Sequence, residues 1–176
     1  LLREFHTKNY EKGWNLSNVG DKQEYRDLLA NYHKVIEAFL ELDVKYQKSI
    51  TDICKKMGNG MADFGEKEIT TLEDYNLYCH YVAGLVGIGL SEIFAASGID
   101  NKELESQVAL SNSMGLFLQK TNIVRDYKED LDEKRFFWPK EVWSLYSPRF
   151  EDFPLNPEKP ESIACLNHMV NDALSH

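Results

Sequence analysis

Apolar side chains recur every three or four residues along most of the chain, which is the spacing of amphipathic α-helices. The first such stretch, residues 21–57, predicts one helix or two in succession. Two more stretches cover residues 75–96 and 102–132, and the last covers residues 160–174. No stretch alternates with the period of two that marks a β-strand. The pattern therefore predicts an all-α protein.

Helix-breaking residues are unevenly distributed, which sharpens this prediction. All five prolines lie after Trp138, so long helices are expected before that residue. Thr70 stands three residues before Glu73, which is the spacing of a capping box at the start of the second helix. Residues 97–101 are a turn cluster rich in Ser, Gly, Asp and Asn. Residues 146–160 hold four of the prolines and predict a loop.

Three glycines, Gly84, Gly87 and Gly89, lie inside the second predicted helix, where each costs about 1 kcal/mol relative to alanine. The cost is explained if another backbone or a ligand must approach the helix closely. The pattern leaves two interpretations open, namely tight packing of a second helix or a wall beside a bound ligand.

The 176-residue chain is 43% hydrophobic and has a formal charge of −9, from 20 Lys and Arg against 29 Asp and Glu. This length favours a single domain with a sizeable core. The acidic balance, without a basic run, argues against nucleic acid as a partner, because that affinity needs clustered positive charge. Three cysteines without a CxxC pair indicate neither a zinc site nor a disulfide framework, and they are typical of a reducing compartment.

The longest apolar run, residues 81–90, is about half of the roughly 20 residues that a membrane helix needs, so no span is expected within the chain. No signal peptide is recognisable. The chain begins with Leu1 and ends within an amphipathic pattern, so we expect it to be a fragment of a longer protein.

One face of the third predicted helix carries side chains suited to a metal. At about 100° per residue, four positions fall within an arc of about 80°: Gln119, Asn122, Asp126 and Asp130. Two carboxylates one turn apart can hold Mg²⁺ together with phosphate oxygens and water. Ordinary acidic residues on a solvated face are the alternative. An EF-hand is excluded, because the segment from Asp126 has lysine at the third loop position and leucine where glycine is needed.

Two residues near this face could also carry chemistry. Tyr78 places a hydroxyl beside the apolar face of the second helix, although a buried tyrosine that only satisfies its hydrogen bond fits the same pattern. Arg135 follows the acidic residues directly, so it could bind a diphosphate or pair with Asp132 or Glu133.

Four segments together closely resemble the squalene synthases of eukaryotes. They are residues 78–87 (YCHYVAGLVG), 112–130 (NSMGLFLQKTNIVRDYKED), 52–62 (DICKKMGNGMA) and 137–143 (FWPKEVW). The resemblance covers nearly the whole chain, and the proline-rich loop is its least similar part. It implies an all-α, isoprenoid-synthase-type helical bundle that is incomplete, with residues 1–176 as part of a single domain lacking its N-terminal and C-terminal helices.

The resemblance also implies an activity. Members of this family condense two farnesyl diphosphates head to head to presqualene diphosphate, which is then reduced by NADPH to squalene. Phytoene synthases are the related alternative. Two aspartate-rich motifs hold Mg²⁺ in this family, and Asp126, Glu129 and Asp130 match the second motif. The first motif is expected to precede Leu1.

Further roles follow from the same resemblance. Tyr78 matches the essential tyrosine of the first half-reaction, and Arg125 and Arg135 match arginines that hold diphosphate. Glu92 departs from the family, in which a basic residue is expected at this position. The residues expected to bind substrate are Val82, Val86, Leu90, Met114, Leu118, Gln119 and Asn122.

The resemblance implies farnesyl diphosphate as substrate, Mg²⁺ and NADPH as cofactors, and a monomer at the cytosolic face of the endoplasmic reticulum membrane, held there by segments outside this chain. Without the first aspartate-rich motif, the isolated chain is expected to be inactive. Two other classes stay open. A catalytically silent helical module could keep the fold alone, and a divalent-metal buffer would need ligands beyond one helix face, which the sequence does not offer.

Overall fold

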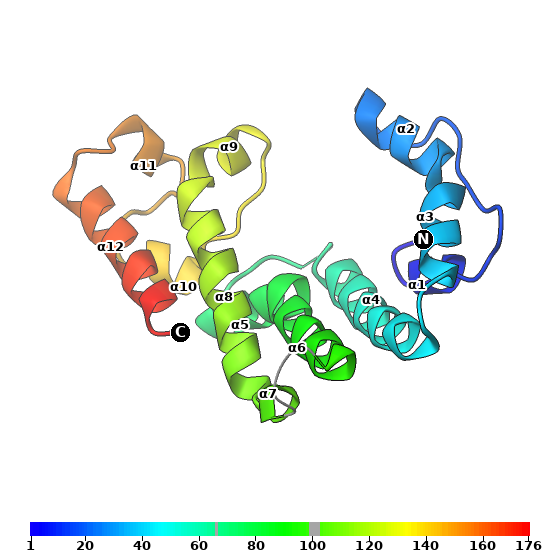
Figure 1. Cartoon of the computed structure of the whole chain (residues 1–176). Coiled ribbons are helices and arrows are strands. Elements are labelled where there is room, and N and C mark those ends of the chain that lie inside the picture. The colour runs from blue at the N-terminus through cyan, green and yellow to red at the C-terminus, as the bar shows by residue number, and fades with distance from the viewer. Residues whose placement is uncertain (66, 99–102) are drawn as a thin grey trace.

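The computed structural model describes residues 1–65, 67–98 and 103–176, and within these ranges every regular element is a helix (Figure 1). The all-α prediction is therefore confirmed. The predicted turn cluster at residues 97–101 lies partly outside the described residues, and so does the first residue of the helix predicted at 102–132.

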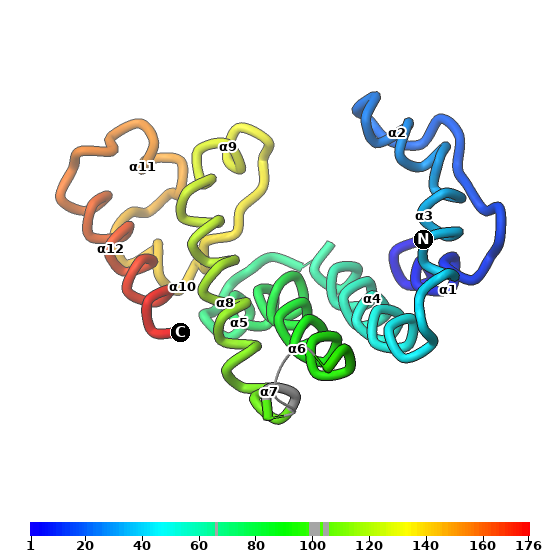
Figure 2. Tube along the Cα trace, viewed as in Figure 1, coloured from blue at the N-terminus to red at the C-terminus, as the bar shows by residue number. Residues whose placement is uncertain are grey.

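The helices are α1 (Phe5–Lys8), α2 (Gln23–Ala30), α3 (Tyr32–Leu40), α4 (Val44–Phe64), α5 (Leu72–Cys79), the π-helical turn η1 (His80–Gly84), α6 (Leu85–Ser97), α7 (Glu103–Ser106), α8 (Val108–Arg125), α9 (Tyr127–Asp132), α10 (Lys140–Trp143), α11 (Asp152–Leu155) and α12 (Pro160–Leu174). The longest form a row in which α4 packs on α6, α6 on α8, and α8 on α12. Figure 2 shows α1–α3 beside α4 at one end of this row and α10–α12 beside α8 at the other.

The first predicted stretch folds as three helices rather than one or two. The chain breaks at Asn31, whose side chain donates to the Asp27 carbonyl at 2.9 Å. It breaks again before Asp43, which caps α4 by accepting from the Lys45 backbone N–H at 3.0 Å. Apolar periodicity persists across both breaks, because each helix continues to bury a face, whereas short polar side chains bond to the local backbone.

The second predicted helix extends continuously from Leu72 to Ser97 through η1. Its capping box joins Thr71 and Asp74, one residue later than the Thr70 and Glu73 pair expected from the sequence. Both pairs have the required spacing, so the sequence pattern alone does not distinguish them.

The glycines of this helix are explained by helix packing. A Cβ on Gly87 would lie 2.3 Å from the Ser111 carbonyl oxygen of α8, and one on Gly84 would lie 2.1 Å from Asn112 Oδ1. A Cβ on Gly89 would lie 2.7 Å from an Ile53 side-chain carbon of α4.

The continuous run Leu72–Ser97 is long and apolar enough, by length and composition alone, to cross a membrane. No membrane span was predicted from the sequence, because the longest uninterrupted apolar run in this region is only residues 81–90. Core helices can meet the same two criteria, and this run packs between α4 and α8 with 28% of its most apolar window buried.

The remaining predictions of helices and loops are confirmed only in part. The helix predicted to reach Asp132 instead ends at Arg125, and after Asp126 the chain starts the short helix α9. The predicted loop contains the single helical turn α11, whereas α12 has the bounds expected from the sequence, with Pro160 in its first turn.

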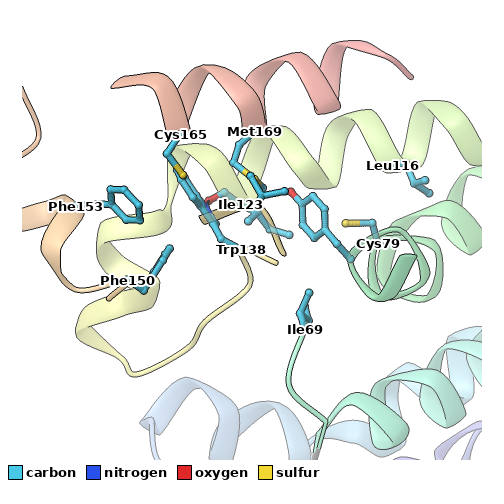
Figure 3. Close-up of a cluster of buried hydrophobic side chains, with 11 residues drawn as sticks. Ile69, Cys79, Leu116, Ile123, Trp138, Phe150, Phe153, Cys165 and Met169 are labelled. Carbon is cyan, nitrogen blue, oxygen red and sulfur yellow. Dashed lines mark hydrogen bonds between the residues drawn. The ribbon is translucent and has the colours of Figure 1, made fainter. Parts of the chain in front are cut away.

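The main core lies between α5, α8, α12 and the segment that follows α9 (Figure 3). Aromatic rings of that segment, including Trp138 and Phe150, fill the space below α12. The buried members are Ile69, Tyr75, Cys79, Leu116, Ile123, Trp138, Val142, Phe150, Phe153, Cys165 and Met169. This core fixes α8 and the α9 turn relative to α5, and these three elements carry the candidate site.

Candidate functional site

Tyr78 lies near the end of α5 in an aromatic setting. Its ring stacks on Phe137, with centroids 5.1 Å apart and planes inclined by 21°. It also meets Phe64 edge-on, with centroids 5.6 Å apart. These rings border a hollow of about 470 Å³, called here the Tyr78 hollow. Its lining residues are Phe64, Gly65, Lys67, Glu68, Ile69, Tyr78, Lys134, Arg135, Phe136 and Phe137.

Partial burial shifts the pKa of Tyr78 upward. Loss of solvent raises the pKa of Tyr78 to about 12, and the neighbouring groups Cys79 and Asp130 act in the same direction, while Arg135 opposes them. The phenol therefore keeps its proton at neutral pH. It can donate a hydrogen bond or a proton, and its ring offers an electron-rich face to a cation.

Arg135 is anchored to Asp130 by both its backbone and its side chain. Its backbone N–H donates to the Asp130 carbonyl at 2.7 Å, while the Lys134 N–H donates to the Leu131 carbonyl at 3.0 Å. These two bonds form a Schellman motif at the end of α9. Arg135 Nη2 then donates to Asp130 Oδ1 at 2.7 Å, and Nη1 pairs with Glu133 at 2.8 Å. Asp130 is only 8% exposed, so this arginine compensates a nearly buried carboxylate.

Asp126 occupies the break between α8 and α9. Arg125 forms a bidentate pair with it, through Nε at 2.6 Å and Nη2 at 2.7 Å. This pairing lowers the pKa of Asp126 below its usual value. Its side chain is 35% exposed and is not among those that line the Tyr78 hollow, and Glu129 is exposed. The break means that Asp130 lies on a different helix from Asp126, so the straight-helix arc of four residues does not describe the site.

The exposed face of α8 changes from apolar to polar along its length. Leu110, Met114 and Leu118 are 64%, 54% and 49% exposed. The next positions at the same four-residue step are Asn122 and Asp126, both partly exposed. Because each step of four residues advances about 40° around a helix, this row winds gradually around α8, and only its last three members, Leu118, Asn122 and Asp126, lie within about 80° of one another.

Helix α6, which packs on α8, carries expected substrate-binding residues of its own. Val86 and Leu90 are 39% and 46% exposed, and Phe94 continues their line at 44%. Val82 and Gln119 are partly exposed. Several exposed apolar side chains on neighbouring helices are typical of a surface that contacts an apolar ligand or another apolar protein surface.

The carboxylates have the donor chemistry that Mg²⁺ prefers, and Mg²⁺ commonly uses one or two protein carboxylates together with substrate phosphates and water. Within the described ranges no three metal-ligating side chains converge. Asp126 and Asp130 are instead each neutralised by an arginine. The residues thus fit a site in which a diphosphate supplies further ligands to the ion and accepts hydrogen bonds from the arginines.

Sequence reasoning missed three parts of this site. Phe137 was noticed only within a family segment, although it stacks on Tyr78. Lys67 and Lys134 line the Tyr78 hollow, but nothing in their local pattern marks them. Their position depends on how the segments that precede α5 and follow α9 fold against each other.

Comparison with known proteins shows the family and the fold of the chain. The squalene/phytoene synthase family matches residues 2–176. The whole chain is 51% identical to squalene synthase 1 of Panax ginseng and to a squalene synthase of Solanum lycopersicum, and 49% identical to squalene synthase BSS of Botryococcus braunii. The chain spans 42%, 42% and 39% of these relatives. A solved structure of TcSQS with a bound ligand superposes with a TM-score of 0.95 at 44% identity, over 99% of this chain and 52% of that one.

The all-α bundle predicted from the sequence is thus the helical fold of a squalene synthase, present here in part. The residue segments that carry the resemblance lie on α4, on α5 to α6, on α8 to α9 and at α10. On this evidence the chain belongs to the squalene/phytoene synthase family.

Proposed function

We propose that this chain forms one half of the active site of a squalene synthase, which condenses two farnesyl diphosphates to presqualene diphosphate and reduces that product to squalene. The observation that carries the proposal is the face of α8 on which exposed Leu118 is followed by the partly exposed polar side chains of Asn122 and Asp126. A prenyl diphosphate has the same order, with an apolar chain ending in an anionic group. The identity of 49–51% to squalene synthases supports this choice over a phytoene synthase.

In this proposal apolar residues of η1, α6 and α8 hold the prenyl chains. Val82, Val86 and Leu90 form one wall, and Met114 and Leu118 form the other. Burial of the chains against these residues excludes water from the carbon that loses diphosphate, and this protects a carbocation from hydration. Gln119 and Asn122 supply polar contacts where the exposed apolar residues of α8 end.

The charged residues stabilise the leaving group. Arg125 and Arg135 exchange their present carboxylate partners for diphosphate oxygens, with which a guanidinium forms bidentate hydrogen bonds. Asp126, Glu129 and Asp130 would hold Mg²⁺, which when bound neutralises the charge that develops on the departing diphosphate. Tyr78 would place its ring and hydroxyl beside the reacting carbon, where cation–π attraction contributes about 0.5–2 kcal/mol.

The remaining parts of the proposal concern the whole protein. Residues 1–176 would be part of one domain, completed by a facing aspartate-rich motif and further helices. NADPH would be the reductant, although no residues of this chain are assigned to it. The protein would act as a monomer at the cytosolic face of the endoplasmic reticulum membrane. The chain alone would make no squalene, because the described carboxylates supply only one side of an ion clamp.

The experiment is product analysis with the complete protein that contains this sequence. Farnesyl diphosphate and Mg²⁺ should yield presqualene diphosphate, and added NADPH should convert the product to squalene. Phytoene formed from geranylgeranyl diphosphate would support the alternative enzyme, and absence of any product would support a catalytically silent module. Tyr78→Phe retains the ring, so loss of presqualene diphosphate in that variant would assign the function to the hydroxyl.

A further inference from the structure

The Tyr78 hollow is cationic in a chain that is acidic overall. Three positively charged residues line it, namely Lys67, Lys134 and Arg135, against one negatively charged residue, Glu68. The whole chain has a formal charge of −9. A cluster of like charges raises the local concentration of counter-ions, so this lining favours an anionic ligand.

Two of the three cations already have partners. Lys67 Nζ donates to Asp74 Oδ1 at 2.5 Å. Arg135 pairs with Asp130 and Glu133. The exposed ammonium of Lys134, by contrast, has no hydrogen bond or ion pair with another residue in the part of the chain that the structure describes. Its charge is therefore free for a ligand.

The backbone of Lys134 is also unfavourable for a lysine. Its φ is +59°, in the left-handed region, where it occupies the Schellman position that most helices fill with glycine. Glycine would form the same turn without steric cost, so the fold itself gives no reason for a long side chain here. Strained conformations of this kind are typical of functional positions, where binding compensates for the strain.

We propose that Lys134 contacts the diphosphate group of the ligand in the Tyr78 hollow, as an additional binding residue of this chain. The proposal rests on the proposed function and extends it to a residue that the family resemblance does not assign. The Schellman turn holds Lys134 next to Arg135, so both side chains reach the same anion. Lysine acts here as a compact charge with three N–H donors, whereas the neighbouring guanidinium of Arg135 provides a planar pair of N–H donors.

Lys134→Gly tests this contact, because it should weaken binding of the anion while it relieves the backbone strain and so does not lower stability. In the complete protein with Mg²⁺, calorimetry would measure the Kd for inorganic diphosphate and, separately, for the unreactive analogue farnesyl thiodiphosphate. We expect the Kd of both to rise about fivefold, the factor for one exposed charge contact. The melting temperature should stay equal to that of the wild type or rise, since glycine relieves the backbone strain. Lys134→Arg should keep the wild-type Kd.

Two variants make the result decisive. Lys128→Met removes a lysine of α9 that is paired with Asp132 at 2.6 Å outside the hollow, and it should leave both Kd values unchanged. Arg135→Gln should weaken binding if the hollow holds diphosphate at all. A wild-type Kd for Lys134→Gly together with weaker binding by Arg135→Gln would overturn the role of Lys134 alone. A wild-type Kd for both variants would overturn the assignment of diphosphate to this hollow.

Discussion

The ammonium of Lys120, which is completely buried, donates to the carboxylate of Asp172 at 2.6 Å and so joins α8 to α12. The same ammonium lies 5.1 Å from the centroid of the Tyr75 ring and 2.9 Å from His176 Nε2. Lys120 follows Gln119 directly but points away from the exposed face of α8. The pair therefore holds α8 against α12 from its buried side.

Removal of Lys120 should destabilise the fold strongly. Lys120→Met leaves Asp172 without its partner, and we expect a loss of about 3 kcal/mol in the free energy of unfolding. Urea unfolding measures this change. The double variant Lys120→Met with Asp172→Leu should recover most of the loss, because no unpaired charge remains. Lys128→Met, on the exposed side of α9, should change stability by less than about 0.5 kcal/mol. Equal effects of both lysine substitutions would contradict the buried pair.

Substitution of two neighbouring threonines tests which of them caps α5. Thr71 accepts from the Asp74 backbone N–H at 3.0 Å, and the Asp74 carboxylate accepts from the Thr71 N–H at 3.2 Å. Thr71→Ala should therefore cost about 1 kcal/mol. Thr70→Ala is the matched control and should be close to neutral, because the capping box does not use its side chain. Urea unfolding compares the two, and a larger effect at Thr70 would restore the assignment made from the sequence.

Stability at high pH should depend on Tyr78. Its pKa is raised from about 10 in an unfolded chain to about 12 in the fold. The contribution of Tyr78 to the free energy of unfolding is fully present below pH 10 and is lost as the pH rises toward 12, because Tyr78 ionises more readily in the unfolded chain than in the fold. Tyr78→Phe cannot ionise, so its urea midpoint should fall less between pH 8 and pH 11 than that of the wild type. Tyr25→Phe, at a position 50% exposed, should fall as the wild type does. Identical pH dependence of all three proteins would show that Tyr78 is not shielded from water.

Much of the helical architecture could be predicted from the sequence, because apolar periodicity reports which face each helix buries. Helix α12 is predicted at both ends by Pro160 and the last apolar residues. Breaks at Asn31, Asp43 and Asp126 were missed, since a helix can end without disturbing the phase of its apolar positions. Local side-chain bonds at the first two breaks explain what periodicity does not detect.

Helical spacing and the family motif named individual candidate residues, but neither gave the way in which they come together. Asp130 and Arg135 are five positions apart and are joined by the turn after α9, a geometry that a straight helix does not give. Phe137 and Lys134 approach Tyr78 through chain segments more than 50 residues away from it. Such contacts depend on tertiary packing, and one sequence carries no local signal for them.

In the proposed function, the Asp126 carboxylate at the end of α8 assists the departure of diphosphate. The most direct measurement is the rate of diphosphate release from farnesyl diphosphate by the complete protein with Mg²⁺, compared between Asp126→Asn and the matched control Asp132→Asn. Asp132 lies on α9 with its side chain 64% exposed and paired with Lys128. We predict that Asp126→Asn lowers the rate by about 100-fold or more, with the urea midpoint unchanged, and that Asp132→Asn stays within about twofold of the wild type. A rate for Asp126→Asn equal to that of Asp132→Asn would contradict the account.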